Sequence, residues 1–363
     1  MEVNMMLTQQ LKNAFRKYRK NRWNRLYDIP HHFKADQALK SLASQGKTIS
    51  PGQESQCLDY ANSVLGSKAF SPWLKVYTAF QGEFKEGWIP DNYIGRIVSP
   101  AMNGPWRGIG QFKTLSRRIV NSPSIPDLAY FIKGSWVSLE GEPVNLKQVK
   151  EICFQDFSHV FLKMDFSQQG KGIIKLDKSK FDGLDYSSLG DFVLQKPIKQ
   201  HSFLEEISPG SVATLRVTTV KLAGNSAVNR LSGLRIGSKG EEFITSKNSL
   251  RIPIFLKTGD FFESALKSDW SILSSHPETG EKFKGLTFPH FHKVVRYCEM
   301  LHDQFPHFQL IAWDVSVDDL GEVFIMEWNT DEPGIIYSEA TIGPHFRDLG
   351  WENLWKKAPN GAL

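Results

Sequence analysis

The stretch Phe308–Asn329, FQLIAWDVSVDDLGEVFIMEWN, is the most informative part of this chain, and it has the pattern of a β-hairpin. Gln309–Val317 is apolar and rich in β-branched residues, which predicts the first strand. Asp318–Gly321 provides turn residues, and Glu322–Trp328 predicts the return strand. The stretch therefore predicts two antiparallel strands joined by a short loop.

Three residues of this hairpin carry oxygen atoms of the kind that bind a divalent cation. With the turn centred between residues 319 and 320, we expect Asp314 to lie opposite Ile325. Glu327 and Asn329 then share the face of Asp314, because strand side chains repeat every two residues. A diagonal pair across two strands is roughly 7–8 Å apart at the backbone, which leaves room for a cation. Two carboxylates and one amide are hard oxygen donors, and they predict a Mg²⁺ site shared with phosphates.

The same residues admit a simpler interpretation, which is a hairpin with one solvated face that carries Asp314 and Glu327 by chance. The register is also an assumption, because a loop of odd length would turn one strand over. Against the simpler interpretation, both acids lie inside very apolar strands, where an unpaired charge is costly.

The composition is that of an ordinary globular protein with more than one lobe. The chain has 363 residues, which predicts two or three lobes, and its contents of 40% hydrophobic and 23% charged residues are unexceptional. No apolar run approaches the roughly 18 residues of a membrane span, and no signal-peptide pattern is visible. The three cysteines are far apart without zinc spacing, which predicts a protein of the reducing cytoplasm.

A basic segment, Leu11–Arg25 (LKNAFRKYRKNRWNR), lies near the N-terminus of a chain whose formal net charge is +5. It holds seven Lys and Arg residues and no acid, and Phe15, Tyr18 and Trp23 interleave with them. One interpretation is a helix on an anionic membrane surface or an acidic partner. The other is a solvated helix whose aromatic residues pack on the body of the protein. Nucleic acid is not an expected partner, because the rest of the chain is nearly charge-balanced.

The remaining pattern predicts a helical region over residues 1–100 and an α+β region after it. The predicted strands are Ala129–Ile132, Trp136–Leu139, Val160–Met164, Ile173–Leu176, Asp191–Gln195, Thr214–Leu222 and Asn229–Ile236. The predicted helices of the second region are Gln111–Val120, Glu151–Phe157 and Phe288–Asp303.

The segment at residues 160–175, VFLKMDFSQQGKGIIK, predicts a strand, a polar loop with two glycines and a second strand. Gly170 and Gly172 allow the backbone N–H groups to approach a phosphate closely. Lys163, late in the first strand, can reach the same phosphate as a point charge. The Walker pattern GxxxxGK[ST] is absent, and a Gly-rich hairpin without a ligand fits the segment equally well.

Two further segments carry candidate ligand contacts. In FVLQKPI, residues 192–198, a buried strand meets Pro197, which suits either a hinge beside an adenine ring or a plain strand end. Arg216 is centred in the apolar strand of VATLRVTTV and predicts an anionic partner, either a ligand or an internal acid. Arg235, in LSGLRIG, has the same interpretation with less support from its surroundings. The sequence has no HExxH, no GxSxG and no convincing Ser/His/Asp set, so it gives no support for the common hydrolase chemistries.

In chain order, these features resemble the ATP-grasp superfamily, and most closely its sugar-transfer-associated branch. The resemblance covers about residues 100–345 and is carried by LKMDFSQQGKGI, LQKPIKQHSFLEEISPGSVATLRVTT, SHPETGEKF and IAWDVSVDDLGEVFIMEWN. It implies an α+β fold in which two α+β lobes hold ATP between them. Most ATP-grasp enzymes activate a carboxylate as an acyl phosphate, which an amine or another nucleophile then attacks.

The resemblance also implies roles for individual residues. Those implied to contact the ATP phosphates are Lys113, Lys163, Gly170, Lys171 and Gly172. Those implied to line the adenine pocket are Gln195, Lys196, Pro197 and Ile198. Those implied to hold one or two Mg²⁺ ions are Asp314, Glu327 and Asn329. Arg216 would act with Lys163 on the transferring phosphoryl group. The chain departs from the family at the hinge, where many members have a glutamate for the ribose, and the next acids here are Glu205 and Glu206.

The resemblance implies a domain order of a helical region at 1–100, a first lobe at 101–195 and a second lobe at 196–363. The activity it implies is an ATP- and Mg²⁺-dependent carboxylate–amine ligase with a small acid and an amine as substrates. By analogy with the branch, a glycan, sugar or peptide is the acceptor in cell-surface polysaccharide biosynthesis. The alternatives are an ATP-dependent phosphotransferase and a nucleotide-binding, non-catalytic partner of a glycosyltransferase, docked through helix 11–25. The expected location is the cytoplasm, either free or at the inner face of the membrane through contact of helix 11–25.

Overall fold

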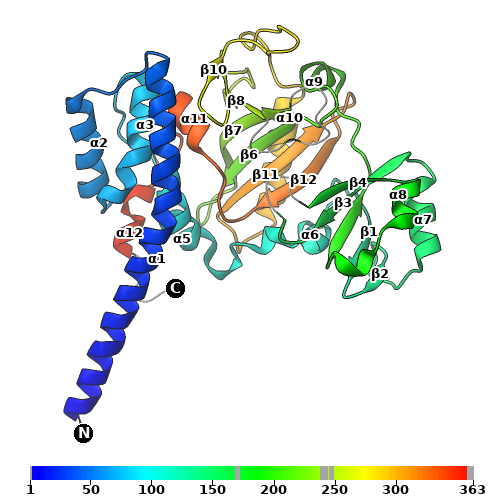
Figure 1. Cartoon of the computed structure of the whole chain (residues 1–363), viewed down its shortest axis with the longest axis horizontal. Coiled ribbons are helices and arrows are strands. Elements are labelled where there is room, and N and C mark those ends of the chain that lie inside the picture. Colours follow the sequence, from blue (N-terminus) through cyan, green and yellow to red (C-terminus); the bar gives the residue numbers. More distant parts are fainter. Residues whose placement is uncertain (1, 168–171, 238–243, 245–248, 358–363) are drawn as a thin grey trace. The chain divides into compact units, whose positions relative to one another are not determined.

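The computed structural model of the chain describes residues 2–167, 172–237, 244 and 249–357, with side chains from residue 12 onward. The chain divides into two compact units (Figure 1). Unit 1 comprises Met1–Ala101, Asp269–Ser271 and Gly334–Leu363, and unit 2 comprises Met102–Ser268 and Ile272–Pro333. The domain boundaries expected at residues 100 and 195 stay a prediction.

Unit 1 is helical, which confirms the helical N-terminal region predicted from the sequence. Its helices are α1 (Glu2–Ser44), α2 (Pro51–Ser63), α3 (Ser71–Gln81), α4 (Asp91–Tyr93), α11 (Ile336–Thr341) and α12 (Leu354–Lys357). The short helix α5 (Ser99–Asn103) follows at the boundary with unit 2. Large aromatic side chains fill the core of unit 1, among them Trp73, Tyr77, Trp88, Tyr93 and Trp351. No helix in the described part of the chain is both long and apolar enough to cross a lipid bilayer.

The first sheet of unit 2 has five antiparallel strands in the order β2-β1-β5-β3-β4. Its strands are β1 (Asp127–Ile132), β2 (Ser135–Val137), β3 (His159–Met164), β4 (Ile173–Asp177) and β5 (Phe192–Gln195). Helices α7 (Leu146–Phe154) and α8 (Lys178–Gly183) accompany it, and their Val149 and Phe181 share its core with Leu162. The strands are those that the sequence predicts, with ends displaced by up to two residues.

The second sheet has seven strands in the order β10-β9-β8-β7-β6-β11-β12. Its strands are β6 (Thr214–Val220), β7 (Val228–Ile236), β8 (Leu250–Ile254), β9 (Ala265–Leu266), β10 (Ile272–Leu273), β11 (Leu310–Val317) and β12 (Val323–Asn329). Helix α10 (Phe291–Asp303) packs on β6, β7 and β11. Because side chains alternate along a strand, Leu215 and Val217 join the core that α10 covers, and Arg216 is left for the opposite face.

Two short helices complete unit 2, namely α6 (Lys113–Val120), which contacts β1, β5 and β12, and α9 (Ser202–Ile207). The two sheets with their own helices and separate cores are two α+β lobes, which confirms the fold class expected from the sequence.

Candidate functional site

The hairpin β11–β12 places Asp314 directly opposite Glu327, so the register predicted from the sequence is wrong. Val315 pairs with Ile325, but Asp314 pairs with Glu327, and the shift between them is a β-bulge at Met326. The loop has an odd length, because the pairs nearest the turn are centred on Leu320. A loop of odd length moves the side chains of the return strand to the opposite face of the sheet, and the extra residue of the bulge moves those beyond it back again. Glu327 therefore still shares the face of Asp314.

Asp314 is buried and forms a two-point ion pair with Arg216 from the neighbouring strand β6. The two residues are direct cross-strand partners. Arg216 Nε donates to Asp314 Oδ1 at 2.7 Å, and Nη2 donates to Oδ2 at 2.6 Å. Burial by itself would raise the pKa of Asp314, but Arg216 outweighs it and holds the pKa below its ordinary value. The internal acid, one of the two partners expected for Arg216, is therefore present.

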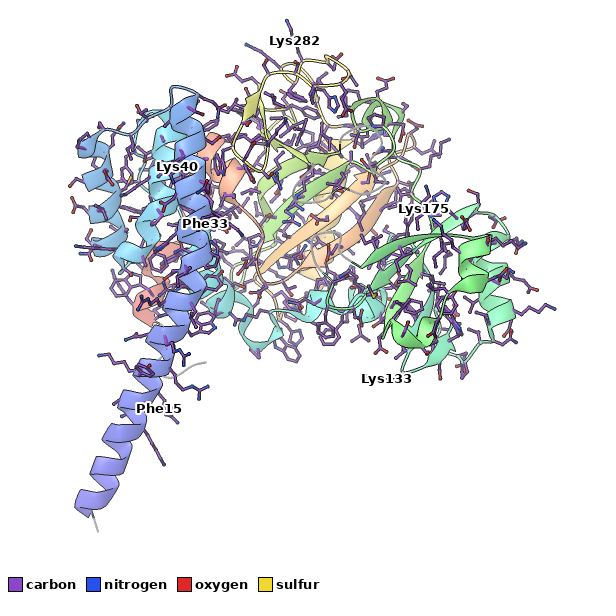
Figure 2. The ribbon with its side chains drawn as sticks, viewed as in Figure 1. Phe15, Phe33, Lys40, Lys133, Lys175 and Lys282 are labelled. Carbon is purple, nitrogen blue, oxygen red and sulfur yellow. The ribbon has the colours of Figure 1, made fainter. Side chains whose placement is uncertain are left out.

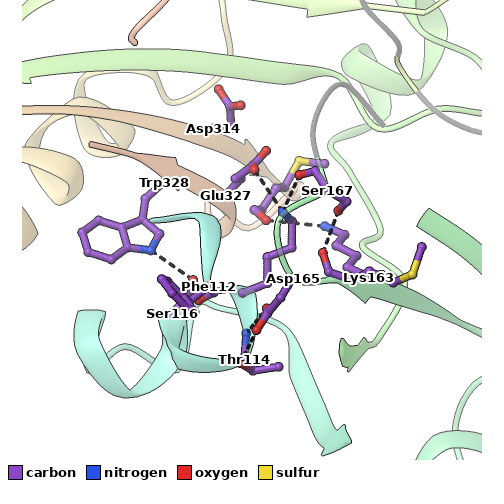
Figure 3. A network of polar contacts seen from close by, with 12 residues as sticks. Phe112, Thr114, Ser116, Lys163, Asp165, Ser167, Asp314, Glu327 and Trp328 are labelled. Carbon is purple, nitrogen blue, oxygen red and sulfur yellow. Dashed lines mark hydrogen bonds and ion pairs between the residues drawn. The ribbon is translucent and has the colours of Figure 1, made fainter. Parts of the chain in front are cut away.

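Glu327 and two lysines from other elements form a charged cluster beside this pair (Figure 3). Lys113, the first residue of α6, lies 3.5 Å from Glu327 Oε1 and donates to the carbonyl of Ser167 at 2.9 Å. Lys163 Nζ, from β3, approaches the carbonyl of Met326 at 3.4 Å. Burial lowers the pKa of Lys163, and Glu327 raises it in part. The structure thus brings both predicted phosphate lysines to the hairpin.

The helix that carries Lys113 is fixed to the end of β3. Asp165 accepts hydrogen bonds from the backbone N–H of Thr114 at 3.0 Å and from its hydroxyl at 2.8 Å. On the other side of the helix, Trp328 donates through Nε1 to the hydroxyl of Ser116 at 3.0 Å. These bonds connect α6 to one sheet through Asp165 and to the other through Trp328, and so hold Lys113 between them.

Two carboxylates and one amide on this face are the donor set available for a cation. Asp314, Glu327 and Asn329 all border the same cavity. The amide nitrogen of Asn329 is buried without a hydrogen-bond partner among the described residues, so its amide group is not committed to the protein. Carboxylate and amide oxygens suit Mg²⁺, which keeps several waters and takes one or two carboxylates from the protein. The residues present therefore fit a Mg²⁺ ion.

The cavity has a volume of about 550 Å³, within the usual range for small-molecule sites, and residues of both sheets line it. Its apolar lining comprises Phe161, Ile173, Ile198, Val212, Ile244 and Met326. Its charged lining comprises Lys163, Lys196, Arg216, Arg235, Asp314, Glu327, Asp331 and Glu332. An apolar patch and a dense set of charges in one cavity suit a ligand with a flat ring and an anionic tail.

Most of the residues singled out from the sequence line this cavity, namely Lys163, Gln195, Lys196, Ile198, Arg216, Asp314, Glu327 and Asn329. Lys113, Gly172 and Pro197 are described but do not belong to its lining. Gly172 has φ +85°, and its carbonyl accepts from the backbone N–H of Met164 at 3.1 Å, so it closes the hairpin β3–β4. Gly170 and Lys171 lie outside the described residues.

The segment predicted as a hinge begins at the end of β5, and Gln195 and Lys196 are bound to the start of β1 and to the residue before it. The side chain of Gln195 donates to Asp127 at 2.8 Å, and the backbone N–H of Lys196 donates to the carbonyl of Pro126 at 2.9 Å. Ile198, beyond the proline, reaches the cavity. The polar side chain of Gln195 is therefore held by the protein itself, and its role toward a ligand stays a prediction.

Sequence reasoning missed Asp127 and gave Arg235 too little weight. Asp127 opens strand β1, and nothing in its neighbourhood along the chain distinguishes it from a surface acid. Arg235 lies on β7 opposite Thr214, and in the described residues it has no ion-pair partner. Burial and the nearby Arg216 lower the pKa of Arg235 to about 10. The signal for Arg235 was its place in an apolar strand, the same signal that identified Arg216.

Asp127 predicts a pH-dependent stability. Burial raises its pKa to about 6, against the hydrogen bonds from Gln195 and Tyr130, whereas the ordinary value is 3.8. The folded state therefore binds the proton more tightly, so the free energy of unfolding falls as pH rises from about 4 to about 6. We expect a loss of about 2–3 kcal/mol from this group over that range. Denaturant unfolding of the wild type and Asp127→Asn at both pH values measures it, and an equal slope in the two proteins would contradict the assignment.

Gly110 allows the segment before α6 to lie directly on β12. A Cβ atom at Gly110 would collide with the carbonyl oxygen of Trp328. We expect Gly110→Ala to lower the free energy of unfolding by roughly 1–3 kcal/mol, because the backbone must move apart. Thermal unfolding measures the change, with Gly183→Ala as the control, since a Cβ atom at Gly183 meets open space. Equal melting temperatures for the two variants would show that this contact is not tight.

One of three comparisons with known proteins matches a family. The family described as "Sugar-transfer associated ATP-grasp" matches residues 166–345. A search of curated proteins gives no match. Among similar solved structures is the biotin carboxylase domain of the 2-oxoglutarate carboxylase of Hydrogenobacter thermophilus, with 12% identity, a TM-score of 0.41, and 67% of this chain and 45% of that chain covered.

Two further solved structures are similar to the chain. D-alanyl-alanine synthetase A of Vibrio cholerae has 14% identity and a TM-score of 0.38, with 66% of this chain and 63% of that chain covered. L-amino acid ligase of Bacillus licheniformis has 11% identity and a TM-score of 0.38, with 71% of this chain and 52% of that chain covered. The chain spans less than two thirds of each of the three proteins, and every TM-score is below 0.5. The assignment rests instead on the family match, by which residues 166–345 of the chain belong to the sugar-transfer-associated branch of the ATP-grasp superfamily.

Proposed function

We propose that the protein is an ATP- and Mg²⁺-dependent ligase that joins a carboxylate to an amine through an acyl phosphate. The observation that carries the proposal is the cavity of unit 2, where Lys163, Arg216 and Glu327 face one space together with an apolar lining. Phosphoryl transfer needs charge neutralisation and alignment more than a covalent nucleophile of the protein, and these residues provide both. The family match supports the use of ATP.

The residues that would hold Mg²⁺ are Asp314, Glu327 and Asn329. When bound, the ion neutralises phosphate charge and aligns the phosphates for in-line transfer. In the structure, both oxygens of Asp314 accept from Arg216, whereas Glu327 has a single lysine at 3.5 Å. Glu327 is therefore the acid with the greater freedom to bind the ion, and Asp314 would offer its remaining lone pairs.

The cationic residues of the chain would position the reacting groups. Lys113 and Lys163 would hold the ATP phosphates, and Ile198 with Met326 would contact the adenine ring. An oxygen of the substrate carboxylate attacks the γ-phosphorus, the bond to the ADP oxygen breaks, and ADP leaves. The amine then attacks the acyl carbon, the bond from that carbon to the phosphate oxygen breaks, and phosphate leaves while the amine nitrogen loses a proton. Arg216, held by Asp314, stabilises the negative charge that develops on the transferring group.

Arg235 would bind the carboxylate substrate. It lines the cavity on the strand next to that of Arg216, and two neighbouring positive charges favour an anion beside them. A planar guanidinium matches a carboxylate at two points. The residues of the site do not identify the amine substrate. The name of the branch supports a glycan, sugar or peptide as the acceptor, in cell-surface polysaccharide biosynthesis. We propose the cytoplasm as the location of the reaction.

Arg235→Gln is expected to raise the KM for the carboxylate about 10–100-fold and to change the KM for ATP little. Hydrogen bonds to charged groups contribute about 1.5–3 kcal/mol, which corresponds to that range. Steady-state kinetics with each substrate varied in turn measures the two constants. Arg251→Gln is the matched control, because Arg251 lies directly opposite Arg235 but outside the cavity lining. An equal change in both KM values would contradict a carboxylate-specific role.

The release of ADP and free phosphate, measured across pools of amino acids and simple carboxylates with ATP and Mg²⁺, tests the proposed function. A ligase releases both products only when its acid and amine are present. ADP without free phosphate would instead indicate a phosphotransferase. Binding of ATP without turnover in any pool would indicate either that the glycan or peptide acceptor is missing from the pools or that the protein is a non-catalytic partner. No binding of ATP would overturn the proposal.

A further inference from the structure

Helix α1 has an apolar face that contacts the rest of unit 1. Ala35, Ala38 and Leu42 are fully buried, and Asp28 and His31 on the same side are nearly so. At 100° per residue, these five positions lie within about 80° of one another around the helix axis. This face accounts for the packing of α1 on α3 and α4.

A second row of large apolar residues lies on the opposite side of α1, and we call it the α1 stripe. It consists of Phe15, Tyr18, Leu26, Ile29 and Phe33. Their positions also fall within about 80° of arc, centred roughly opposite the buried face. Their exposed fractions are between 53% and 65%, so unit 1 leaves the stripe uncovered. Trp23 lies beside the stripe and is stacked on Tyr27.

The stripe extends along a helix that projects beyond α2 and α3 (Figure 1). Figure 2 labels Phe15 on the projecting part and Phe33 farther along the same helix. From Phe15 to Phe33 the helix rises about 27 Å, at 1.5 Å per residue. The spacing of the stripe follows the 3.6-residue period of a helix instead of the 3.5-residue period of a coiled coil, which suits a flat surface better than a partner helix.

The charge around the first half of the stripe is of one sign. Residues 12–25 include seven Lys and Arg residues and no acid. Arg19, Arg22 and Arg25 lie within or beside the arc of the stripe. None of the seven forms an ion pair with another described residue. A second copy of the helix would bring like charges together, so self-association through this segment is disfavoured.

We propose that the α1 stripe docks the protein on an anionic lipid surface. The apolar side chains would enter the boundary between headgroups and acyl chains, and the flanking arginines would extend to the lipid phosphates. Phe, Tyr, Leu and Ile on one face, with Lys and Arg around them, is the composition of helices that lie in the plane of a membrane. The inference is independent of the ligase chemistry, because it uses no residue of the cavity.

The test is flotation of the full chain with vesicles of two parts phosphatidylcholine and one part phosphatidylglycerol, and with phosphatidylcholine alone. The proposal predicts binding to the anionic vesicles that weakens when salt rises from about 0.1 M to about 1 M. Arg19→Gln/Arg22→Gln/Arg25→Gln should lower the partition coefficient on the order of 100-fold, since each charge near such a surface contributes roughly fivefold. Phe15→Ser/Leu26→Ser/Phe33→Ser should abolish binding.

A matched control removes the same charge elsewhere. Lys133→Gln/Lys147→Gln/Lys282→Gln changes three exposed lysines outside α1 and should bind within a few-fold of the wild type. Glutamine has nearly the helix propensity of arginine, and circular dichroism verifies that each variant is folded. Equal losses in the control and arginine variants would overturn the proposal, as would absence of vesicle binding by the wild type. A dimer in sedimentation that the stripe variant dissociates, without vesicle binding, would assign the stripe to self-association instead.

Discussion

Glu327→Gln is expected to lower turnover by a factor of 10²–10³ while the fold stays intact, if Glu327 behaves like other preorganised electrostatic groups. The substitution keeps the shape of the side chain and removes the charge that would hold Mg²⁺ against the ATP phosphates. The fold should tolerate it, because the ion pair of Glu327 with Lys113 spans 3.5 Å at a partly exposed position. Release of ADP and phosphate measures turnover, and thermal unfolding measures stability.

Glu322→Gln is the matched control for this prediction. Glu322 lies in the loop of the same hairpin, directly before β12, and is exposed and paired with Lys293 at 3.3 Å, but it does not line the cavity. The control should retain wild-type turnover. Titration of the Mg²⁺ concentration adds a second readout, because loss of a metal ligand shifts the half-saturating concentration upward. Wild-type turnover and Mg²⁺ dependence in Glu327→Gln would contradict the metal site.

Arg216→Met is expected to lower the free energy of unfolding by about 3–5 kcal/mol and to abolish turnover. Arg216 donates twice to Asp314, which is only 5% exposed, so the substitution leaves a buried carboxylate without its partner. Breaking one half of a buried ion pair has this cost because the remaining charge stays desolvated. Chemical denaturation at pH 7 measures the loss of stability, and product release measures the loss of activity.

The pH dependence of this variant has a definite sign. In the wild type, Arg216 holds the pKa of Asp314 below its ordinary value, so the pair stabilises the fold at neutral pH. Without Arg216, only Arg235 and Lys163 oppose the effect of burial, so we expect the pKa of Asp314 to rise and the carboxyl to be less costly when protonated. The loss of stability should therefore be smaller at about pH 4 than at about pH 7. A loss that is the same at both pH values would contradict this account.

The double variant Arg216→Met/Asp314→Leu separates stability from catalysis. Replacing both members of a buried ion pair by apolar residues is often neutral or stabilising, so the double variant should recover most of the stability. Its activity should stay absent, because neither the arginine nor the metal carboxylate is present. Recovery of activity together with stability would mean that both residues are structural.

Local patterns predicted the strands of unit 2, because strand residues show an alternation of apolar and polar side chains that is visible in the sequence. Arg216 and Asp314 could be found in this way, since each is a charged residue inside an apolar run. That they bind one another could not be found, because β6 and β11 are adjacent in the sheet although some 98 positions separate the two residues in sequence. Pairing between distant strands depends on the order of the sheet, which no local pattern records.

By itself the sequence determined the α+β class, the hairpin, the charged residues inside apolar strands and the basic segment of α1. Each of these follows from the period of side chains along a strand or a helix, which is a property of neighbouring residues. Only the tertiary structure decided the odd loop and the bulge at Met326, the ion pair of Arg216, the place of Asp127 and Arg235, and which face of α1 is covered. These features depend on strand register and on contacts between segments that are distant in sequence. Several registers and contacts fit the local pattern equally well, and the packing of the whole unit selects one of them.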